Sequence, residues 1–502
     1  MKKIIIALLC SLLQAVTPCF AQVKGDYIWT LGDGLYDGPG DEYSGMLLDF
    51  HTVPPSIIPT SIPMNEPLAF ICDSTGQLAL YTNGCVIANS SHEVVENGDS
   101  LNPGFWFGQF CEVASYSTYQ GTLFLQQPGH TERYYLFHIK YDDATSWPND
   151  LLYTLTDMSY NGGHGKVLLK NQVIEHERFS LYITAVRHGN GRDWWVVAPR
   201  LYTNTYTTLL LTPEGIEGPF AQSIGDSMSS SLCCGQTAFS ADGSKYFKFL
   251  PKGGLQILDF DRCSGQFSNP LFIPYGADTV GLGGVVGSPN SRYLYLSTGH
   301  YMYQYDLQSS NIPASRQTVG VFDGYADPFF ARFYQGARGP DGKLYFISSS
   351  GVKVMHVIHQ PDEPGLACDF EQHGIHLPAY QSFFMPNFAN YRLYDLPGSA
   401  CDTLGIDGPV VSTAAPTLEQ RGEMRVVPNP TSGLFTLTLP SGTRDALLQV
   451  FHTSGALILE RTLNSDAAVT LDLAQQPAGM YAVRLLDRET GVRKAVKIAV
   501  LR

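Results

Sequence analysis

The chain has 502 residues, which is too long for one ordinary hydrophobic core, so we expect two or three domains. Charged residues make up 16% of it and aromatic residues 12%, a composition typical of a β-rich exported protein. The formal net charge is −14, and a nucleic acid requires clustered lysine and arginine, so we expect no nucleic-acid partner.

The first 21 residues have the pattern of a secretory signal peptide. Lys2 and Lys3 precede a mostly apolar run over residues 4–16, and a plausible cleavage site follows Ala21. No other apolar run approaches the roughly 18 residues that a membrane-spanning helix needs. We therefore expect an exported protein without a transmembrane segment.

An acidic loop follows the first strand-like run, Tyr27–Leu31. Its carboxylates, interleaved with glycines, include Asp33, Asp37 and Asp41. Oxygen ligands of this kind suit calcium, although their spacing is not that of an EF-hand loop. A solvated loop is the alternative, and apart from calcium we expect no cofactor.

Eight cysteines remain after the expected cleavage, an even number that suits disulfides in an exported protein. Cys72 and Cys85 flank a turn, and a disulfide between them is expected to join two strands of one unit. Cys368 and Cys401 bracket the final segment of the propeller. Residues 233 and 234 are adjacent cysteines, and because a bond between neighbours is strained, one of them is expected to reach residue 263. The candidate disulfide cysteines are Cys72, Cys85, Cys234, Cys263, Cys368 and Cys401.

A turn signal recurs between residues 70 and 345. Asp-Gly or a related sequence stands directly before a short apolar or aromatic run, which predicts a tight turn between two strands. These turns lie near residues 74, 130, 191, 242, 290 and 341. Strand-rich units at this spacing predict a β-propeller over residues 22–401. Six complete units and one shared by the two chain ends favour seven blades, with six or eight as alternatives.

Phe105, Trp106 and Phe107 form an aromatic cluster in a glycine-flanked segment that we predict to be a loop. Most aromatic residues of this chain are expected to pack inside and between blades. This cluster is the one that we predict to be exposed, and exposed aromatic side chains recognise sugars and proteins. We therefore identify it as the candidate ligand-binding site.

The sequence contains none of the catalytic motifs that we sought. There is no Gly-x-Ser-x-Gly nucleophile motif, no His-Glu-x-x-His motif and no phosphate loop. The run Ser240–Ser244 departs from the Asp box of sialidase-like propellers, because its glycine stands one place too early and the tryptophan is missing. We assign no catalytic residue, although a single sequence does not reveal carboxylates that converge in space.

Several runs resemble a propeller family that is common in secreted Bacteroidetes proteins. They are Leu78–Gly84, Leu152–Gly165, Ala185–Trp195 and Met385–Phe388. The resemblance implies the fold and an extracellular compartment, and it brings no active site with it.

Residues 402–423 have little bulk and no periodicity, as expected of a linker. Residues 424–502 contain about seven short strands with alternating apolar residues, which predicts a small immunoglobulin-like β-sandwich. The chain is thus predicted to be all-β.

Three motifs of this tail resemble the type A C-terminal sorting domain of the Bacteroidetes type IX secretion system. They stand in the order of that family, and their residues are Pro428, Asn429, Pro430 and Gly433, then Pro477, Gly479 and Tyr481, then Lys494 and Lys497. The resemblance implies export across the inner membrane and recognition of the folded tail by the type IX secretion machinery. Cleavage of the tail would then leave the protein secreted or attached to the outer cell surface.

These patterns together predict a secreted or surface-exposed propeller that binds a glycan or a protein through loops on one face. One alternative is an extracellular glycan hydrolase or lyase with its site in the propeller channel, which would need at least two converging carboxylates there. The other is a passive surface or gliding-associated component. The sorting tail is compatible with all three.

Overall fold

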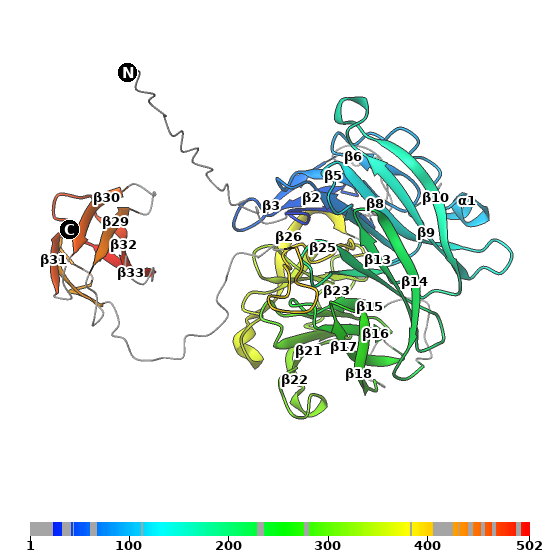
Figure 1. Cartoon of the computed structure of the whole chain (residues 1–502). Coiled ribbons are helices and arrows are strands. Elements are labelled where there is room, and N and C mark those ends of the chain that lie inside the picture. The colour runs from blue at the N-terminus through cyan, green and yellow to red at the C-terminus, as the bar shows by residue number, and fades with distance from the viewer. Residues whose placement is uncertain are drawn as a thin grey trace, which may run out of the picture. The chain divides into compact units, whose positions relative to one another are not determined.

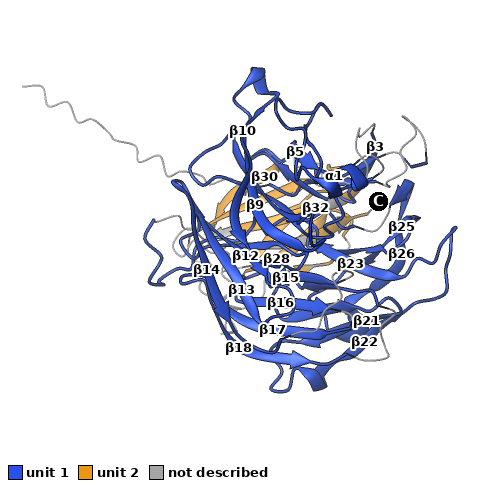
Figure 2. Ribbon diagram, turned by 90° about the vertical axis from the view of Figure 1, so that its right-hand side faces the viewer, with its two compact units in different colours: residues 1–409 blue, residues 410–502 orange. Residues whose placement is uncertain are grey.

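The structure is a computed structural model that describes residues 24–32, 42–43, 45–60, 68–111, 114–227, 235–250, 252–275, 281–381, 384–404, 425–429, 431–439, 445–452, 457–463, 468–487 and 493–501. The predicted signal peptide and Asp33, Asp37, Asp41, Cys234 and Pro430 lie outside these residues. The chain divides into two compact units, residues 1–409 and residues 410–502 (Figure 2). Among the described residues, no helix has the length and apolar character to cross a membrane.

The described residues of unit 1 form seven antiparallel sheets of three or four strands, which follow one another in chain order (Figure 1). The first two sheets are β1 (Ile28–Leu31), β2 (Met46–Asp49), β3 (Ser56–Pro59), and β4 (Ala69–Cys72), β5 (Leu78–Thr82), β6 (Ile87–Asn89). The third and fourth are β7 (Thr122–Gln126), β8 (Arg133–Tyr141), β9 (Pro148–Asp157), β10 (Lys166–His176), and β11 (Thr184–Arg187), β12 (Trp194–Pro199), β13 (Thr205–Thr212), β14 (Gly215–Ser223).

The last three sheets have four strands each. They are β15 (Gln236–Phe239), β16 (Lys245–Leu250), β17 (Gly254–Asp261), β18 (Gln266–Ile273); β19 (Gly284–Gly287), β20 (Tyr293–Ser297), β21 (Tyr301–Asp306), β22 (Gln317–Val321); and β23 (Phe333–Arg338), β24 (Leu344–Ser348), β25 (Val352–Ile358), β26 (Phe370–Gln381). The helical elements are short: α1 (Phe105–Phe110), η1 (Asn161–Gly163), η2 (Pro313–Ser315) and η3 (Gly365–Cys368).

The first strands of successive sheets lie side by side, which makes the unit a β-propeller. β4 contacts β7, β11 contacts β15, β15 contacts β19, and β19 contacts β23. Each sheet is a meander in which strands that are neighbours in sequence are neighbours in space. Sheets arranged in this way around a common axis pack face to face, and their facing side chains form the core. The prediction of an all-β propeller is therefore confirmed.

The six recurring turns all join the first strand to the second in sheets two to seven, as the turn chemistry predicted. In five of them an Asp or Asn side chain accepts a hydrogen bond from the backbone N–H two residues further on. These bonds are Thr75 to Asp73, Arg192 to Asn190, Ser244 to Asp242, Arg292 to Asn290 and Lys343 to Asp341, at 2.8–3.2 Å. The side chain thus fixes a turn that the backbone alone would leave less defined. We call this side of the propeller the turn face, and the side where the first strands begin the entry face.

The N-terminal strand of the propeller, β1, and the segment that follows β26 lie next to each other. They do not pair as strands of one sheet. After β26 the chain passes beside β4, where Asn387 forms a parallel bridge with Ala69. Its Phe388 ring lies 5.1 Å from the ring of Trp29, and Arg392 donates to Asp26 at 2.6 Å. Segment 384–392 therefore runs along the channel side of β1 and meets it through side chains.

Aromatic side chains fill the spaces within and between the sheets. Trp29, Trp194 and a series of tyrosines, among them Tyr81 and Tyr246, are fully buried. Burial of a large apolar side chain contributes about 2–3 kcal/mol each, so these rings account for much of the core. The high aromatic content of the sequence is thus explained mainly by packing.

The cysteines pair differently from the prediction. The two disulfides among the described residues are Cys85–Cys111 and Cys263–Cys401. Cys72 and Cys368 are buried free thiols. Cys72 lies at the end of β4, where its thiol donates to the Ile28 carbonyl and its sulfur accepts the Ile28 N–H, so it contacts the first sheet instead of Cys85. The predicted bond of Cys85 to Cys72 is therefore wrong. The predicted bond of Cys263 to one of the adjacent cysteines at 233 and 234 is wrong as well, because Cys263 pairs with Cys401.

Unit 2 is a β-sandwich of two sheets among its described residues. One sheet has the order β27 (Arg425–Val427), β28 (Leu434–Thr438), β31 (Val469–Asp472), and the other the order β30 (Leu457–Leu463), β29 (Ala446–His452), β32 (Gly479–Asp487), β33 (Arg493–Val500). The predicted alternation is observed, since Phe435, Leu437 and Leu439 are all buried in the shared core. Whether the sandwich is immunoglobulin-like stays a prediction.

Candidate functional sites

Helix α1 carries the aromatic cluster that the sequence pointed to, so the prediction of a loop there is wrong. Pro103 precedes the N-cap Gly104, which has φ +143°. The Asp143 carboxylate accepts the Phe105 N–H at 2.9 Å and lies against Gly104, where a Cβ atom would be 2.3 Å from it. A carboxylate at this position accepts one of the N–H groups that have no partner within the helix. Its negative charge also interacts favourably with the positive end of the helix dipole.

The rings of α1 form a graded stack that runs from the surface into the core. Phe105 is 56% exposed and meets Trp106 edge-on, with ring centroids 5.2 Å apart. Trp106 is partly buried and stacks on Phe110 at 5.2 Å, and Phe110 packs on the buried Tyr116. Phe107 is also partly buried. Of the three predicted residues, only Phe105 therefore presents most of its ring to solvent.

The cluster is held rigidly from below. The Cys85–Cys111 disulfide joins the end of α1 to the segment between β5 and β6. Ahead of the helix, Asn102 accepts from His138 at 2.7 Å and donates to the Gly84 carbonyl at 3.1 Å. Phe105 thus stands on a fixed base, which lowers the entropy lost when a partner binds it.

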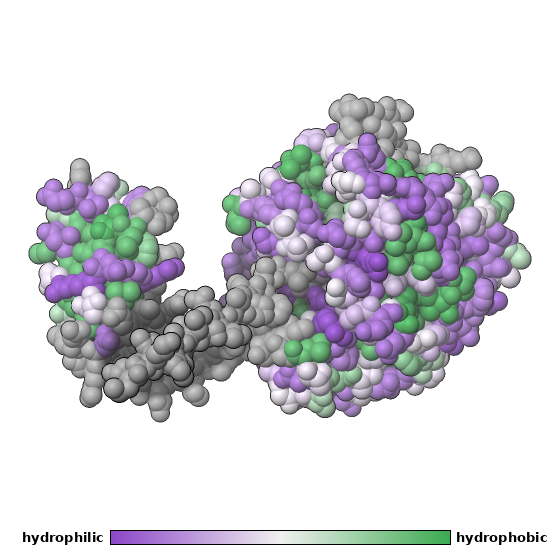
Figure 3. Space-filling model, turned by 45° about the horizontal axis from the view of Figure 1, so that its top comes forward, coloured by the Kyte–Doolittle hydropathy of each residue, from purple (hydrophilic) through white to green (hydrophobic). Residues whose placement is uncertain are grey.

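A second exposed aromatic pair escaped the sequence analysis. Phe329 and Phe330 are 59% and 51% exposed in the segment between β22 and β23. Like α1, this segment leads into the first strand of a sheet, so both lie on the entry face. The signal in the sequence was a pair of adjacent phenylalanines directly after Asp327 and Pro328. Figure 3 shows apolar residues in separate patches among hydrophilic ones on the surface of unit 1.

The channel is occupied by the chain's own segment 384–392 and closed near the entry face by four amide side chains. Gln236 accepts the N–H groups of Val285 and Gly336 at 3.0 and 3.1 Å and donates to the Gly336 carbonyl at 2.7 Å. Gln120 bonds in the same way to both backbone groups of Thr237, each at 2.9 Å. These side chains therefore bond to backbone N–H and C=O groups at the inner edges of the first strands, where no neighbouring strand pairs with them.

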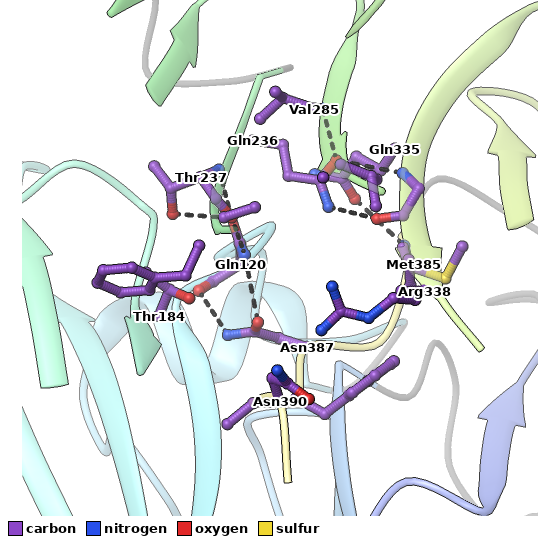
Figure 4. Close-up of a pocket in the computed structure, with 18 of the residues that line it drawn as sticks. Gln120, Thr184, Gln236, Thr237, Val285, Gln335, Arg338, Met385, Asn387 and Asn390 are labelled. Carbon is purple, nitrogen blue, oxygen red and sulfur yellow. Dashed lines mark hydrogen bonds between the residues drawn. The ribbon is translucent and has the colours of Figure 1, made fainter. Parts of the chain in front are cut away.

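Asn387 and Gln335 tie the inserted segment into this network (Figure 4). The Nδ2 atom of Asn387 donates to the carbonyls of Thr122 and Ile183, both at 2.8 Å. Gln335 accepts the Met385 N–H at 3.2 Å. The run Met385–Phe388 is thus the part of the chain that closes the channel, a role that the sequence alone did not reveal.

A cavity of about 90 Å³ remains in the channel beside the inserted segment. Amides, threonines, apolar side chains, Arg338 and Arg392 line it, and no described lining residue is a carboxylate. A glycoside hydrolase of the usual kind needs two carboxyl groups near the scissile bond. The described part of the channel therefore lacks the feature on which the hydrolase alternative depends. No described group of three or more His, Cys, Asp or Glu residues could hold a metal ion.

In unit 2 the first sorting motif contacts the end of β33, the strand that carries the third motif. Asn429 accepts the Ala499 N–H at 3.0 Å, and the Thr431 N–H donates to the Ala499 carbonyl at 2.8 Å. Thr431 also forms a parallel bridge with Val500. Pro428 lies exposed just ahead of these contacts. The start and the end of the tail therefore form one edge of the sandwich.

The other motif residues have backbone and packing roles. Gly433 has φ +133°, and a Cβ atom there would lie 2.4 Å from the Ala474 Cα atom, so only glycine fits. The Tyr481 hydroxyl donates to the Pro477 carbonyl at 2.7 Å, which closes the turn ahead of Gly479. Lys494 and Lys497 lie on β33, opposite Leu485 and Ala482 of β32.

Comparisons with solved structures return propellers and other chains of low similarity. A candidate 6-phosphogluconolactonase from Bacteroides fragilis is 15% identical, with a TM-score of 0.44 over 71% of this chain and 97% of that one. A protein of unknown function from Desulfotomaculum acetoxidans is 13% identical, with a TM-score of 0.40 over 72% and 99%. PorZ, a surface component of the type IX secretion system of Porphyromonas gingivalis, is 11% identical, with a TM-score of 0.28 over 91% and 73%. At such values these similarities say nothing of activity.

No curated protein sequence matches the chain significantly. Residues 425–499 match the family model of the secretion system C-terminal sorting domain. This match covers nearly all of the sandwich and contains the three motifs. It identifies the C-terminal unit as a type IX sorting domain and indicates that the protein is exported to the cell surface.

Proposed function

We propose that this protein is a type IX-exported propeller that binds a glycan or a protein at the cell surface or after release, through the aromatic cluster on α1. The sorting domain accounts for the route of export. The observation that supports recognition is Phe105, an exposed ring on a rigid stack of four other aromatic rings, Trp106, Phe110, Tyr116 and Tyr141.

The cluster suits binding by its chemistry. A ring that is half exposed and held by neighbours offers apolar area at a low cost in side-chain entropy, as the anchor residues of interfaces do. The indole Nε1 atom of Trp106 is buried and has no hydrogen-bond partner among the described residues.

The test is a binding screen of the full-length secreted protein against a glycan array and extracellular-matrix proteins. For any ligand found, replacement F105A is expected to weaken binding about tenfold, since a buried aromatic contact contributes at least about 1.4 kcal/mol. The matched control is L366A, which removes a side chain that is 79% exposed in η3, between β25 and β26 of the seventh sheet. Equal binding by the wild type and F105A would contradict the proposal.

A further inference from the structure

The channel has a second end, where it meets the turn face, and its polar groups there are left open. We call this end the mouth and define it by Phe239, Gly287, Arg338, Asn390 and Arg392, all of which line the cavity. Asn390 shows that the mouth lies near the turn face. Its side chain donates at 2.8 Å to the carbonyl of Ala241, which is in the recurring turn of the fifth sheet. The mouth is thus remote from α1 on the entry face.

Three backbone N–H groups point into the mouth. Alternate residues of a strand direct their N–H groups to the same side. The inward N–H groups of Thr237, Val285 and Gly336 are taken by Gln120 and Gln236 at the closed end. Two residues further along the same strands stand Phe239, Gly287 and Arg338.

The residues that follow them confirm this alternation. The N–H groups of Ser240, Ser288 and Gly339 donate outward to the second strands, at 2.8–2.9 Å. Those of Phe239, Gly287 and Arg338 therefore face the channel. No acceptor is found for them among the described residues. Buried N–H groups without a partner are rare, and several that converge form a site for an anion.

Arg338 adds a full positive charge to these donors. Its side chain is largely buried, and its guanidinium points into the cavity toward Asn387 and Asn390 (Figure 4). It makes no ion pair or hydrogen bond within the described part of the chain. Burial, together with the neighbouring Arg392, lowers the pKa of Arg338 to about 10, which still leaves it charged at neutral pH.

The nearby carboxylate does not balance the charge. Asp26 accepts from Arg392 at 2.6 Å and is fully buried. Its burial outweighs the effect of Arg392 and raises the pKa of the carboxyl group. Even when ionised, Asp26 provides one negative charge next to two guanidinium groups. Asp362 and Asp242 also act on Arg338 electrostatically, but neither forms an ion pair with it. An uncompensated buried cation is costly, and an anion that entered the mouth would relieve that cost.

We propose that the mouth of the channel binds a compact oxyanion, a carboxylate or a phosphate group, between the guanidinium of Arg338 and the N–H groups of Phe239, Gly287 and Arg338. The cavity of about 90 Å³ admits such a group. If the anionic group belongs to a larger molecule, the rest of that molecule would lie outside the mouth, on the turn face. Sugar acids and sugar phosphates carry groups of this kind. The site is independent of the aromatic cluster, so either proposal can fail without the other.

Calorimetric titration of the full-length secreted protein tests the site with three probes. D-glucuronate carries the carboxylate, inorganic phosphate carries the phosphate, and D-glucose is the neutral control. We expect heat of binding with one of the two anions and none with glucose. In R338Q the affinity for that anion should fall at least about tenfold, as for loss of a charged hydrogen-bond donor. The control R292Q removes an exposed arginine that is paired with Asp306 in the sixth sheet, and it should bind like the wild type.

A crystal of the wild-type protein soaked in selenate gives a second readout that does not depend on folding of a variant. An anomalous peak is expected within hydrogen-bond distance of Arg338 and the Gly287 N–H. The proposal is overturned if neither anion binds at millimolar concentration, or if R338Q and the wild type bind equally. A selenate peak only at other places would overturn it as well.

Discussion

The two ends of the propeller channel are built from the same strands and treat the same backbone groups in opposite ways. At the closed end the side chains of Gln120, Gln236 and Gln335 satisfy the inner edges of the strands. At the mouth the next N–H groups along three of those strands have no acceptor in the part of the chain that the structure describes, and Arg338 lies among them. We infer from this comparison that the closed end stabilises the fold, whereas the mouth is the end at which a ligand binds. Binding sites commonly give up stability in this way.

The largest effect should come from the covalent tie on the turn face. The Cys263–Cys401 disulfide holds the segment that leaves the mouth and closes a stretch of 138 residues, whereas Cys85–Cys111 closes 26. The chain-entropy model gives about 5 kcal/mol for the longer loop and about 3.5 kcal/mol for the shorter one. The double variant C263S/C401S should therefore lose more free energy of unfolding than C85S/C111S, as measured by urea denaturation. The reverse order would mean that segment 384–404 is held mainly by its other contacts.

The parts of this architecture that the sequence predicted depend on neighbours in the chain. In five of the six turns an Asp or Asn bonds to a backbone group two residues away, so these turns and their strands could be predicted from the sequence. The order of the three sorting motifs was readable for the same reason. The disulfides, the glutamine network and the mouth join residues far apart, such as Gln120 and Thr237 at a separation of 117. Nothing local encodes such contacts.

One signal for the mouth was present in the repeats themselves. The residue directly ahead of the turn-forming segment is Phe239 in the fifth sheet, Gly287 in the sixth and Arg338 in the seventh. An arginine among apolar or small residues at the same position of a repeat indicates a special role, because equivalent positions share an environment. Alignment of the units by their turns would have picked out two arginines, Arg338 and Arg187 of the fourth sheet. Of these, Arg187 is already engaged, because it donates to the Arg192 carbonyl and lies over the Trp194 ring.

The second effect in size concerns the closed end. Replacement N387A removes the donor to the carbonyls of Thr122 and Ile183 and leaves both buried without it. We expect a loss of about 3 kcal/mol in the free energy of unfolding. At the mouth, N390A removes one bond to the Ala241 carbonyl and should cost about 1 kcal/mol. Urea denaturation of both variants measures the difference, and equal losses would remove the distinction between the two ends.

A third effect is a dependence of stability on pH, which originates at His138 on β8, the strand next to β7. His138 lies opposite Thr122 across the β7–β8 pair and is fully buried. Its Nδ1–H donates to Asn102, and its Nε2 accepts the Thr154 hydroxyl at 3.0 Å, so the bonds require a neutral ring. Burial accordingly lowers the pKa of His138 to about 3.

The sign of this dependence follows from proton uptake. Histidine in the unfolded chain has a pKa near 6.5. As the pH falls below that value the unfolded state gains a proton that the folded state does not accept, so the free energy of unfolding decreases. Between pH 6.5 and 5, His138 should account for a loss of about 2 kcal/mol. His356, which burial also holds at a pKa of about 3, should add a similar amount. Replacement H138Q should therefore reduce the slope by about half, whereas H164Q at an exposed position should not change it. An unchanged slope in H138Q would mean that water reaches this ring, and that the packing under α1 is looser than its hydrogen bonds indicate.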